Sequence, residues 1–346
     1  MRSFSRYVAL FGAFTLAVIV TPQTAFGAGS REPAGQPAQT LTLYSGRGES
    51  LVDPIVRRFE DETGIRVNVR YGGTAELAVL LSEEGSRSPA DLFWAQDAGA
   101  LGAVSDLLAE LPERVFAALP DIYRSRAARW VATSGRARVL AYSTDRADPG
   151  DVPASVFDLT DRRYAGRVGW APTNGSFQAF VTAMRVNHGE QATRSWLIGM
   201  RENDTVAYRN NTALLEAIGA GEIDFAITNN YYLLRFAAND PNFPVAQSFF
   251  GARGDVGNLI NVAGIGIPAA SGKHDAAIRF VEFLLAEPAQ VFFTGEVYEY
   301  PVTDRVEPNA LLESFSTVLE FSPEIDLDSL EDLEATLALL REVELL

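Results

Sequence analysis

Residues 41–94 read LTLYSGRGESLVDPIVRRFEDETGIRVNVRYGGTAELAVLLSEEGSRSPADLFW. In 65–71 apolar and polar residues alternate as in a half-buried strand, whereas in 49–63 the apolar residues recur at helical spacing. Short strand patterns lie at both ends of the stretch, and a second helical pattern covers 74–85. The resulting order, β-α-β-α-β, predicts a parallel sheet with helices packed on its faces.

The middle of the chain repeats this pattern. Strands are predicted at 137–143, 166–172 and 222–228, and the last of them leads directly into the helical sequence NNYYLLRFAA. A further strand is predicted at 259–268. Because 346 residues exceed what one hydrophobic core usually organises, the two sheet-forming regions predict two lobes of class α/β. Ligands of such open sheets bind beyond the carboxyl ends of the strands.

The N-terminal segment has the composition of a secretory signal peptide. Arg2 and Arg6 precede an apolar run, 7–20, that is too short to span a bilayer comfortably, and small residues follow it. An uncleaved membrane anchor is the alternative. The chain has no cysteine, which excludes a lipid-modified cysteine and disulfides. We therefore expect an exported periplasmic protein that is no lipoprotein and has no membrane segment after cleavage.

The charge and the motifs exclude several classes of function. The formal net charge of −16 repels nucleic acid, and no basic patch with interleaved aromatic residues is present. The two histidines, His188 and His274, lie in polar, loop-like sequence, and no hydrolase, metalloprotease or P-loop motif occurs. We therefore do not predict an enzyme, although a secreted hydrolase with a carboxylate pair is an alternative that the sequence leaves open.

A pair of tyrosines, Tyr231 and Tyr232, follows the strand at 222–228. On a strand the two side chains would point to opposite faces, but on the first turn of a helix they can flank one cleft. Two phenol oxygens in one cleft suit a hard cation that displaces the phenol proton, and ferric iron is the obvious candidate. Packing of the two rings into an interdomain surface is the alternative.

Several polar residues stand near other strand ends. The sequence TNGSF at 173–177 predicts either an anion-binding nest or a turn with a helix cap. The pairs Asn210-Asn211 and Asn229-Asn230 precede helices, so each is a cap or a ligand contact. Gln96-Asp97 can hold a ligand or begin the next helix. Arg136 and Arg138 flank a turn before a strand, where an arginine can bind an oxyanion or make a surface ion pair.

Four segments give the chain a resemblance to a known family: EEGSRSPADLFW (83–94), SGRARVLAYST (134–144), GRVGWAPTNGSF (166–177) and GEIDFAITNNYY (221–232). In these segments, and in their order over residues 41–310, the chain resembles the periplasmic ferric-iron-binding proteins. The resemblance implies a two-lobed periplasmic binding protein-like fold with the ligand cleft between lobes, each lobe a mostly parallel sheet flanked by helices. It also implies a monomer that delivers iron to an inner-membrane ABC permease.

The same resemblance implies a role for particular residues. Tyr231 and Tyr232 match the tyrosine pair that binds Fe(III). The resemblance also implies a partner anion, carbonate or phosphate, bound by the residues that match the family's anion pocket. Arg136 stands where the family has an arginine facing the cleft. The matching anion residues are Asn174, Gly175, Ser176, Asn210 and Asn229.

Three positions depart from the family pattern. Gly48 and Gln96 stand where the best-known branch has a histidine and a glutamate ligand, and Phe177 stands where another branch has a third tyrosine. An oxygen-rich octahedral site needs about six donors. We expect Glu49, Gln96, Asp97, water or anions to supply the rest. Otherwise the cargo is an iron chelate, or another small ligand such as an oxyanion, a phosphonate or an organic cation.

The resemblance and the strand order together predict the domain boundaries. They are a signal peptide at 1–28, a flexible leader at 29–40, a discontinuous first lobe at 41–136 and 263–310, a second lobe at 137–262, and C-terminal helices at 311–346 that pack on the second lobe.

Overall fold

The computed structural model describes residues 39–117, 119–120 and 123–346, so the predicted signal peptide and nearly all of the leader lie outside the described residues. The chain divides into two units, Met1–Pro37 and Ala38–Leu346, and the fold belongs to the second. Within the described ranges, no helix has both the length and the apolar character that a membrane span requires.

Nine strands within these residues form two sheets that share one long strand, β4. The strands are β1 (Thr40–Ser45), β2 (Arg66–Tyr71), β3 (Leu92–Ala95), β4 (Trp130–Ser143), β5 (Val168–Trp170), β6 (Val206–Ala207), β7 (Phe225–Asn229), β8 (Val245–Ser248) and β9 (Ile260–Gly266). Their order is β2-β1-β3-β9-β4-β7-β5-β6, and β8 pairs with β4. Strands β1, β2 and β3 are parallel, as are β5, β6 and β7, which agrees with the predicted βαβ pattern.

The central strand β4 is longer than the sequence pattern predicts. The prediction began at residue 137, but residues from Trp130 onward already pair antiparallel with β9. The last part of β4 pairs with β7 on one side and with β8 on the other. We call β1, β2, β3, β9 and the first part of β4 sheet 1, and β5 to β8 with the last part of β4 sheet 2.

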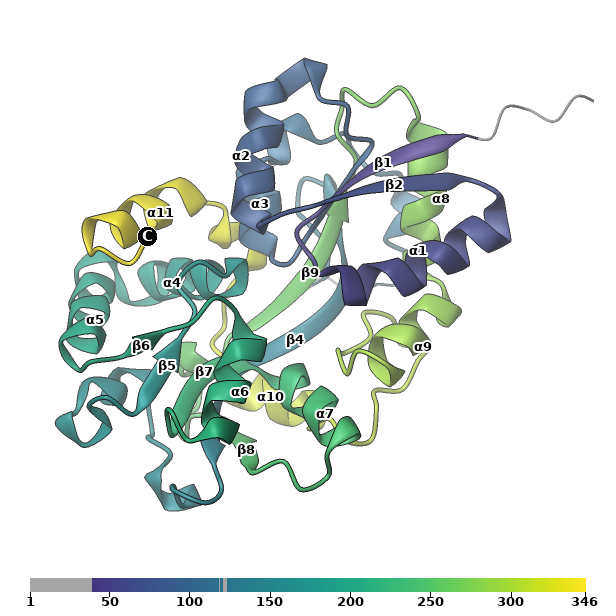
Figure 1. Ribbon diagram of the computed structural model, residues 1–346. Coiled ribbons are helices and arrows are strands. Elements are labelled where there is room, and N and C mark those ends of the chain that lie inside the picture. Colours follow the sequence, from purple (N-terminus) through teal and green to yellow (C-terminus); the bar gives the residue numbers. More distant parts are fainter. Residues whose placement is uncertain (1–38, 118, 121–122) are drawn as a thin grey trace, which may run out of the picture. The chain divides into compact units, whose positions relative to one another are not determined.

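The helices cover the faces of these sheets. Figure 1 shows α1, α2 and α8 beside sheet 1 and α4 to α7 around sheet 2, with β4 and β9 running between the two groups. In chain order the helices are α1 (Glu49–Thr63), α2 (Thr74–Glu84), α3 (Ala98–Ala103), α4 (Gly175–His188), α5 (Glu190–Glu202), α6 (Asn211–Ala220), α7 (Asn230–Asn239), α8 (His274–Leu285), α9 (Glu287–Gly295), α10 (Phe315–Phe321) and α11 (Leu333–Glu342).

Local sequence explains most helix boundaries. Helix α1 ends at Gly64, whose φ of 70° is left-handed and favours glycine. Asn210 caps α6 and Asn174 caps α4, each through its side-chain oxygen. Helix α5 was not predicted, although Trp196 and Met200 recur on its buried face at helical spacing.

The C-terminal segment contacts helices beside both sheets. From α11, Thr336 shares a buried hydrogen bond of 2.7 Å with Thr182 of α4. Ahead of α11, Leu330 packs so closely on α3 that a Cβ added to Gly99 would lie 2.6 Å from the Leu330 carbonyl oxygen. The segment therefore joins α4, which belongs to the predicted second lobe, to α3, which belongs to the first.

Candidate functional site

Tyr231 and Tyr232 lie in the first turn of α7, directly after β7. Consecutive residues of a helix diverge by about 100°, yet the two rings stack with centroids 4.3 Å apart and planes inclined by 28°. Their side chains are only 4% and 9% exposed. The two phenols therefore lie side by side in one buried place.

A buried ion pair from sheet 1 lies within electrostatic range of these rings. Arg47, two residues after β1, contacts Glu299, in the loop after α9, at 2.8 Å, and their side chains are 2% and 1% exposed. Burial disfavours the charged arginine, but Glu299, and more weakly the two phenols, raises the Arg47 pKa above its usual range. Because sheet 2 carries the tyrosines and sheet 1 carries Arg47, the phenols lie where the two sheets meet.

The environment holds Tyr231 in its neutral form in the ligand-free protein. Burial raises the pKa of Tyr231 well above its ordinary value, and the neighbouring Tyr232 and Glu299 add to the effect. Arg136 and Arg47 act in the opposite direction. Ionisation of this phenol therefore needs a ligand that replaces the proton with a larger positive charge.

The residues predicted to bind an anion form one connected group at the start of α4. The side-chain oxygen of Asn174 accepts hydrogen bonds from the Ser176 backbone N–H at 3.0 Å and from the Ser176 hydroxyl at 2.6 Å. Asn229, the last residue of β7, donates its amide to the Ser176 hydroxyl at 3.2 Å. The start of α4 is thereby tied to the start of α7, which carries the tyrosine pair.

Two buried arginines of β4 bring positive charge to this group. Arg136 and Arg138 are 3% and 2% exposed, and each keeps one buried nitrogen without a hydrogen-bond partner. Neither pairs with a carboxylate among the residues described. Burial, and then Arg136, lowers the Arg138 pKa to about 9, and Arg138 donates to the Ser176 carbonyl at 3.2 Å. This part of the site therefore favours a negatively charged ligand.

Asp97 reaches the start of α4 from sheet 1. It follows β3 and caps α3, because its Oδ1 accepts from the Ala100 N–H at 2.9 Å. Its Oδ2 is buried and has no hydrogen-bond partner among the described residues. A Cβ added to Gly175 would lie 3.0 Å from this Oδ2 and 3.1 Å from Cβ of Thr74. Because Gly175 has no side chain, the start of α4 can lie close to Asp97, which follows β3, and to Thr74, the first residue of α2.

The buried carboxyl of Asp97 gives the ligand-free protein a pH-dependent stability. Burial raises its pKa from 3.8 to about 6, so the folded state holds this proton more tightly than the unfolded state. Stability is therefore lost as pH rises from about 4 to about 6, by about 3 kcal/mol in total. Because asparagine also caps helices well, Asp97→Asn should raise the free energy of unfolding at pH 7.5 and leave it unchanged at pH 3.5. Urea unfolding of both proteins at the two pH values measures this, and an equal change at both would contradict it.

Three predicted residues take no part in these contacts. Glu49 is exposed in the first turn of α1, and its charge acts on Tyr71 at the end of β2. Gln96 is half-buried, and its backbone N–H donates to the Thr74 hydroxyl at 3.3 Å. Asn210 is half-buried, and its side chain accepts from the Ala213 N–H at the start of α6. In the described ranges, no group of three or more His, Asp or Glu side chains is placed to hold a metal ion.

The structure also adds two residues that the sequence did not single out: Arg47 and Glu299. Arg136 and Arg138 were expected to flank a turn before a strand, but both lie within β4 and are buried. Arg47 could have been found, because it lies in YSGRGE, just after the predicted first strand. Glu299 carried no such signal, since it is 252 residues from Arg47 in the chain.

Comparison with known proteins identifies the family. The chain matches the model of the family described as bacterial extracellular solute-binding protein over residues 44–291. The chain belongs to this family. The major ferric iron-binding protein of Neisseria meningitidis serogroup A is 35% identical to it over 286 residues, which cover 79% of this chain and 86% of the relative. The predicted resemblance to periplasmic ferric-iron-binding proteins is thereby confirmed.

Solved structures support the same fold for this solute-binding protein. Iron-bound HitA from Pseudomonas aeruginosa has a TM-score of 0.84 and 31% identity, covering 88% of this chain and 99% of that one. The Trichodesmium protein IdiA (FutA), in complex with iron and citrate, has a TM-score of 0.72 and 26% identity, covering 89% and 100%. The predicted α/β periplasmic binding fold is therefore confirmed, and the Neisseria relative is named as a binding protein.

Proposed function

We propose that this solute-binding protein captures ferric iron together with an anion in the periplasm and delivers it, as a monomer, to an ABC permease of the inner membrane. The observation that carries the proposal is the stacked, buried phenol pair at the meeting of the two sheets. Relatives named for ferric iron binding support it.

The electrostatics of the tyrosine pair favour a trivalent ion over a divalent one. Burial and the neighbouring Tyr232 oppose ionisation of Tyr231, so a weak Lewis acid would leave the phenol protonated. Ferric iron is hard and highly charged, and it prefers oxygen donors. Because binding releases phenol protons, we expect iron affinity to fall as the pH falls.

The proposed anion binds at the start of α4. Asn174, Gly175, Ser176 and Asn229 would hold it there, where the positive end of the helix dipole favours an anion. The buried charges of Arg136 and Arg138, which form no ion pair within the described residues, support the same position. Carbonate and phosphate fit this group, and so does citrate, which accompanies iron in the Trichodesmium relative.

For the remaining iron donors we propose residues at or next to Gly48 and Gln96, where the best-known branch of the family has its other two ligands. Of Glu49, Gln96 and Asp97, the last is the one whose carboxylate oxygen is buried without a partner. Glu49 and Gln96 would have to turn toward the phenols to contribute, and Asn210 toward the anion. Oxygens of the anion and water would complete the coordination.

Strands β4 and β9 connect the two halves of the proposed binding cleft. Strand β4 passes from sheet 1 into sheet 2, and β9 pairs with its first part (Figure 1). Bending in these strands would therefore move the tyrosines away from Arg47 and Asp97. We propose that the two halves, with the lobe boundaries predicted above, open at this hinge and close when ligand bridges them.

A titration of iron-free protein with ferric citrate tests the function. We expect a visible charge-transfer band from iron-bound phenolate that saturates at one equivalent and is strengthened by carbonate or phosphate. A colourless complex, or no saturable binding, would remove ferric iron as the cargo.

A second cargo, an oxyanion without iron, is favoured by the two buried arginines, which have no carboxylate partner in the part of the chain that the structure describes. Isothermal titration of the iron-free protein with phosphate or a phosphonate distinguishes the two. Tight binding of the anion that iron does not strengthen would support the oxyanion.

A further inference from the structure

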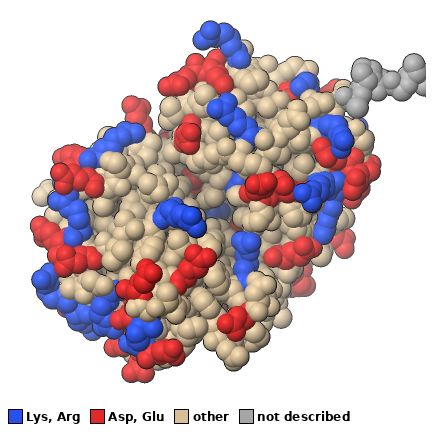
Figure 2. Space-filling model, viewed as in Figure 1, with Lys and Arg blue, Asp and Glu red and all other residues tan. Residues whose placement is uncertain are grey.

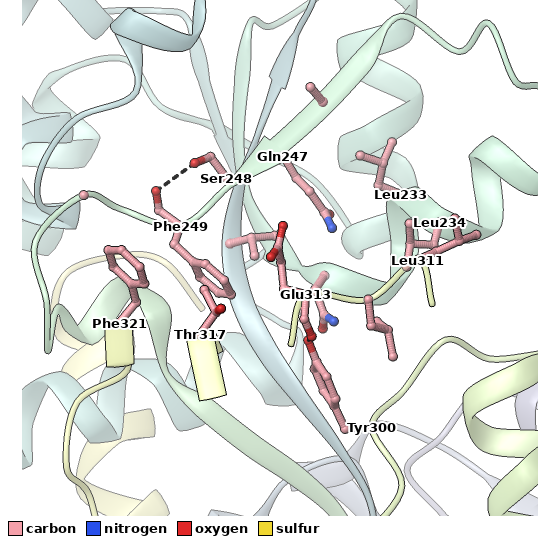
Figure 3. Close-up of a pocket in the computed structure, with 15 residues that line it drawn as sticks. Leu233, Leu234, Gln247, Ser248, Phe249, Tyr300, Leu311, Glu313, Thr317 and Phe321 are labelled. Atoms are coloured by element: carbon pink, nitrogen blue, oxygen red, sulfur yellow. Dashed lines mark hydrogen bonds between the residues drawn. The ribbon is translucent and has the colours of Figure 1, made fainter. Parts of the chain in front are cut away.

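A pocket of about 630 Å³ lies beside α7, at a place that the proposed iron site does not use. Figure 3 shows its lining, which comes from β8, from α7 and from the C-terminal segment around α10. Neither Tyr231 nor Tyr232 lines it. Its volume falls within the range of small-molecule sites, roughly 300–1,000 Å³.

The walls of the pocket are largely apolar and aromatic. Leu233 and Leu234 of α7 face it, and Phe249 and Phe321 stack with centroids 6.0 Å apart and planes inclined by 8°. At the rim, Leu311 is 65% exposed, which is unusual for a large apolar side chain. An apolar ligand body would remove this surface from water.

The hydroxyl groups of the lining are engaged within the protein. Ser248 donates to the Phe249 carbonyl at 3.0 Å, drawn as the dashed line in Figure 3. Tyr300 donates to the backbone carbonyl of Glu313 at 2.7 Å. Thr317 shares a hydrogen bond of 2.8 Å with Ser314. The hydroxyls of Ser248 and Tyr300 are therefore not free donors for a ligand, whereas Thr317 either donates to Ser314 or accepts from it.

The groups of the lining that make no hydrogen bond within the described residues include two acceptors, beside the amide nitrogens of Asn230 and Gln247. Gln247 has a buried Oε1 without a hydrogen-bond partner in the described part of the chain. The Glu313 carboxylate makes no hydrogen bond or ion pair with any residue that the structure describes, and the lining includes no Lys, Arg or His. Figure 3 shows both side chains projecting among the aromatic and leucine residues. The Glu313 side chain is exposed at the rim. A positively charged hydrogen-bond donor would therefore complement both the Gln247 oxygen and the Glu313 carboxylate.

We propose that this pocket binds a protonated amine with an apolar body. The ammonium group would donate to the Gln247 Oε1 and to the Glu313 carboxylate, and the apolar body would pack against Leu233, Phe249 and Phe321. The aromatic rings add an electrostatic attraction for the cation. The proposal is independent of the cargo held by the tyrosine pair.

A chemical-shift titration by NMR of the iron-free protein tests the proposal with three probes of similar size. They are 2-phenylethylammonium, the neutral 2-phenylethanol and the anionic 3-phenylpropionate. We expect the ammonium compound to bind most tightly, with shifts centred on Leu233 and Gln247. Glu313→Gln should weaken its binding about three- to fivefold and leave the neutral probe unchanged.

The matched control is Glu307→Gln, because Glu307 is an exposed carboxylate on the same segment that does not line the pocket. Binding of the ammonium probe should be unaffected by this change. Equal affinity for all three probes, equal effects of the two substitutions, shifts centred elsewhere, or no binding at up to about 10 mM would each overturn the proposal.

Discussion

Tyr231→Phe and Tyr232→Phe should each abolish most of the visible iron band and weaken ferric iron binding by more than about 100-fold. Removing a residue that only supports a metal ligand already costs about 10–100-fold, and each phenol is proposed to be a ligand itself. Phenylalanine keeps the ring, so the stacking at 4.3 Å should persist. A ferric citrate titration followed at visible wavelengths measures the loss.

The control for the tyrosine variants is Tyr208→Phe. Tyr208 bonds to Glu222 through its hydroxyl, at a partly exposed position in the same half of the protein. This change should leave the iron band and the affinity intact. If either variant of the pair retained the full band, its phenol would be no iron ligand. If both variants retained the full band, the two rings would only pack between the two sheets.

Arg47→Met should lower the free energy of unfolding by about 3–5 kcal/mol, because it leaves the buried Glu299 carboxylate without its partner. The variant Arg47→Met/Glu299→Leu should recover most of this loss, since neither charge then remains buried alone. Urea unfolding of the iron-free proteins measures both changes. A double variant as unstable as the single one would show that Arg47 stabilises the fold by packing, for example on Trp94, and not by its charge.

A surface pair provides the comparison for this experiment. Arg58 and Glu296 lie at the same distance, 2.8 Å, but their side chains are 45% and 59% exposed. Arg58→Met should therefore cost no more than about 1 kcal/mol. A similar loss in the two arginine variants would contradict the role given to burial.

The exposed surface carries charged side chains of both signs. On the face drawn in Figure 2, acidic and basic side chains are interspersed, and no continuous basic area crosses it. This distribution agrees with the acidic net charge of −16.

The sequence predicted those site residues that can be recognised from their neighbours in the chain. Tyr231 and Tyr232 were found because two adjacent phenols follow a strand and begin a helix, and Asn174, Gly175 and Ser176 because they begin another. Arg136 and Arg138 were expected either to bind an oxyanion or to make a surface ion pair, and the sequence could not show that both are buried. Glu299 could not be found, since nothing near it in the chain marks it as the partner of Arg47.

By itself, the sequence determined the α/β class, the order of strands and helices, and the place of the tyrosine pair at a strand-to-helix junction. These follow from periodicity, caps and glycines, which act over a few residues. Only the tertiary structure decided that β4 serves two sheets, and that Arg136 and Arg138 are buried with no carboxylate partner among the described residues. It also decided that the phenols lie within electrostatic range of the Arg47–Glu299 ion pair. Burial and pairing depend on which distant segments pack together, and the pKa values of the site depend on that packing in turn.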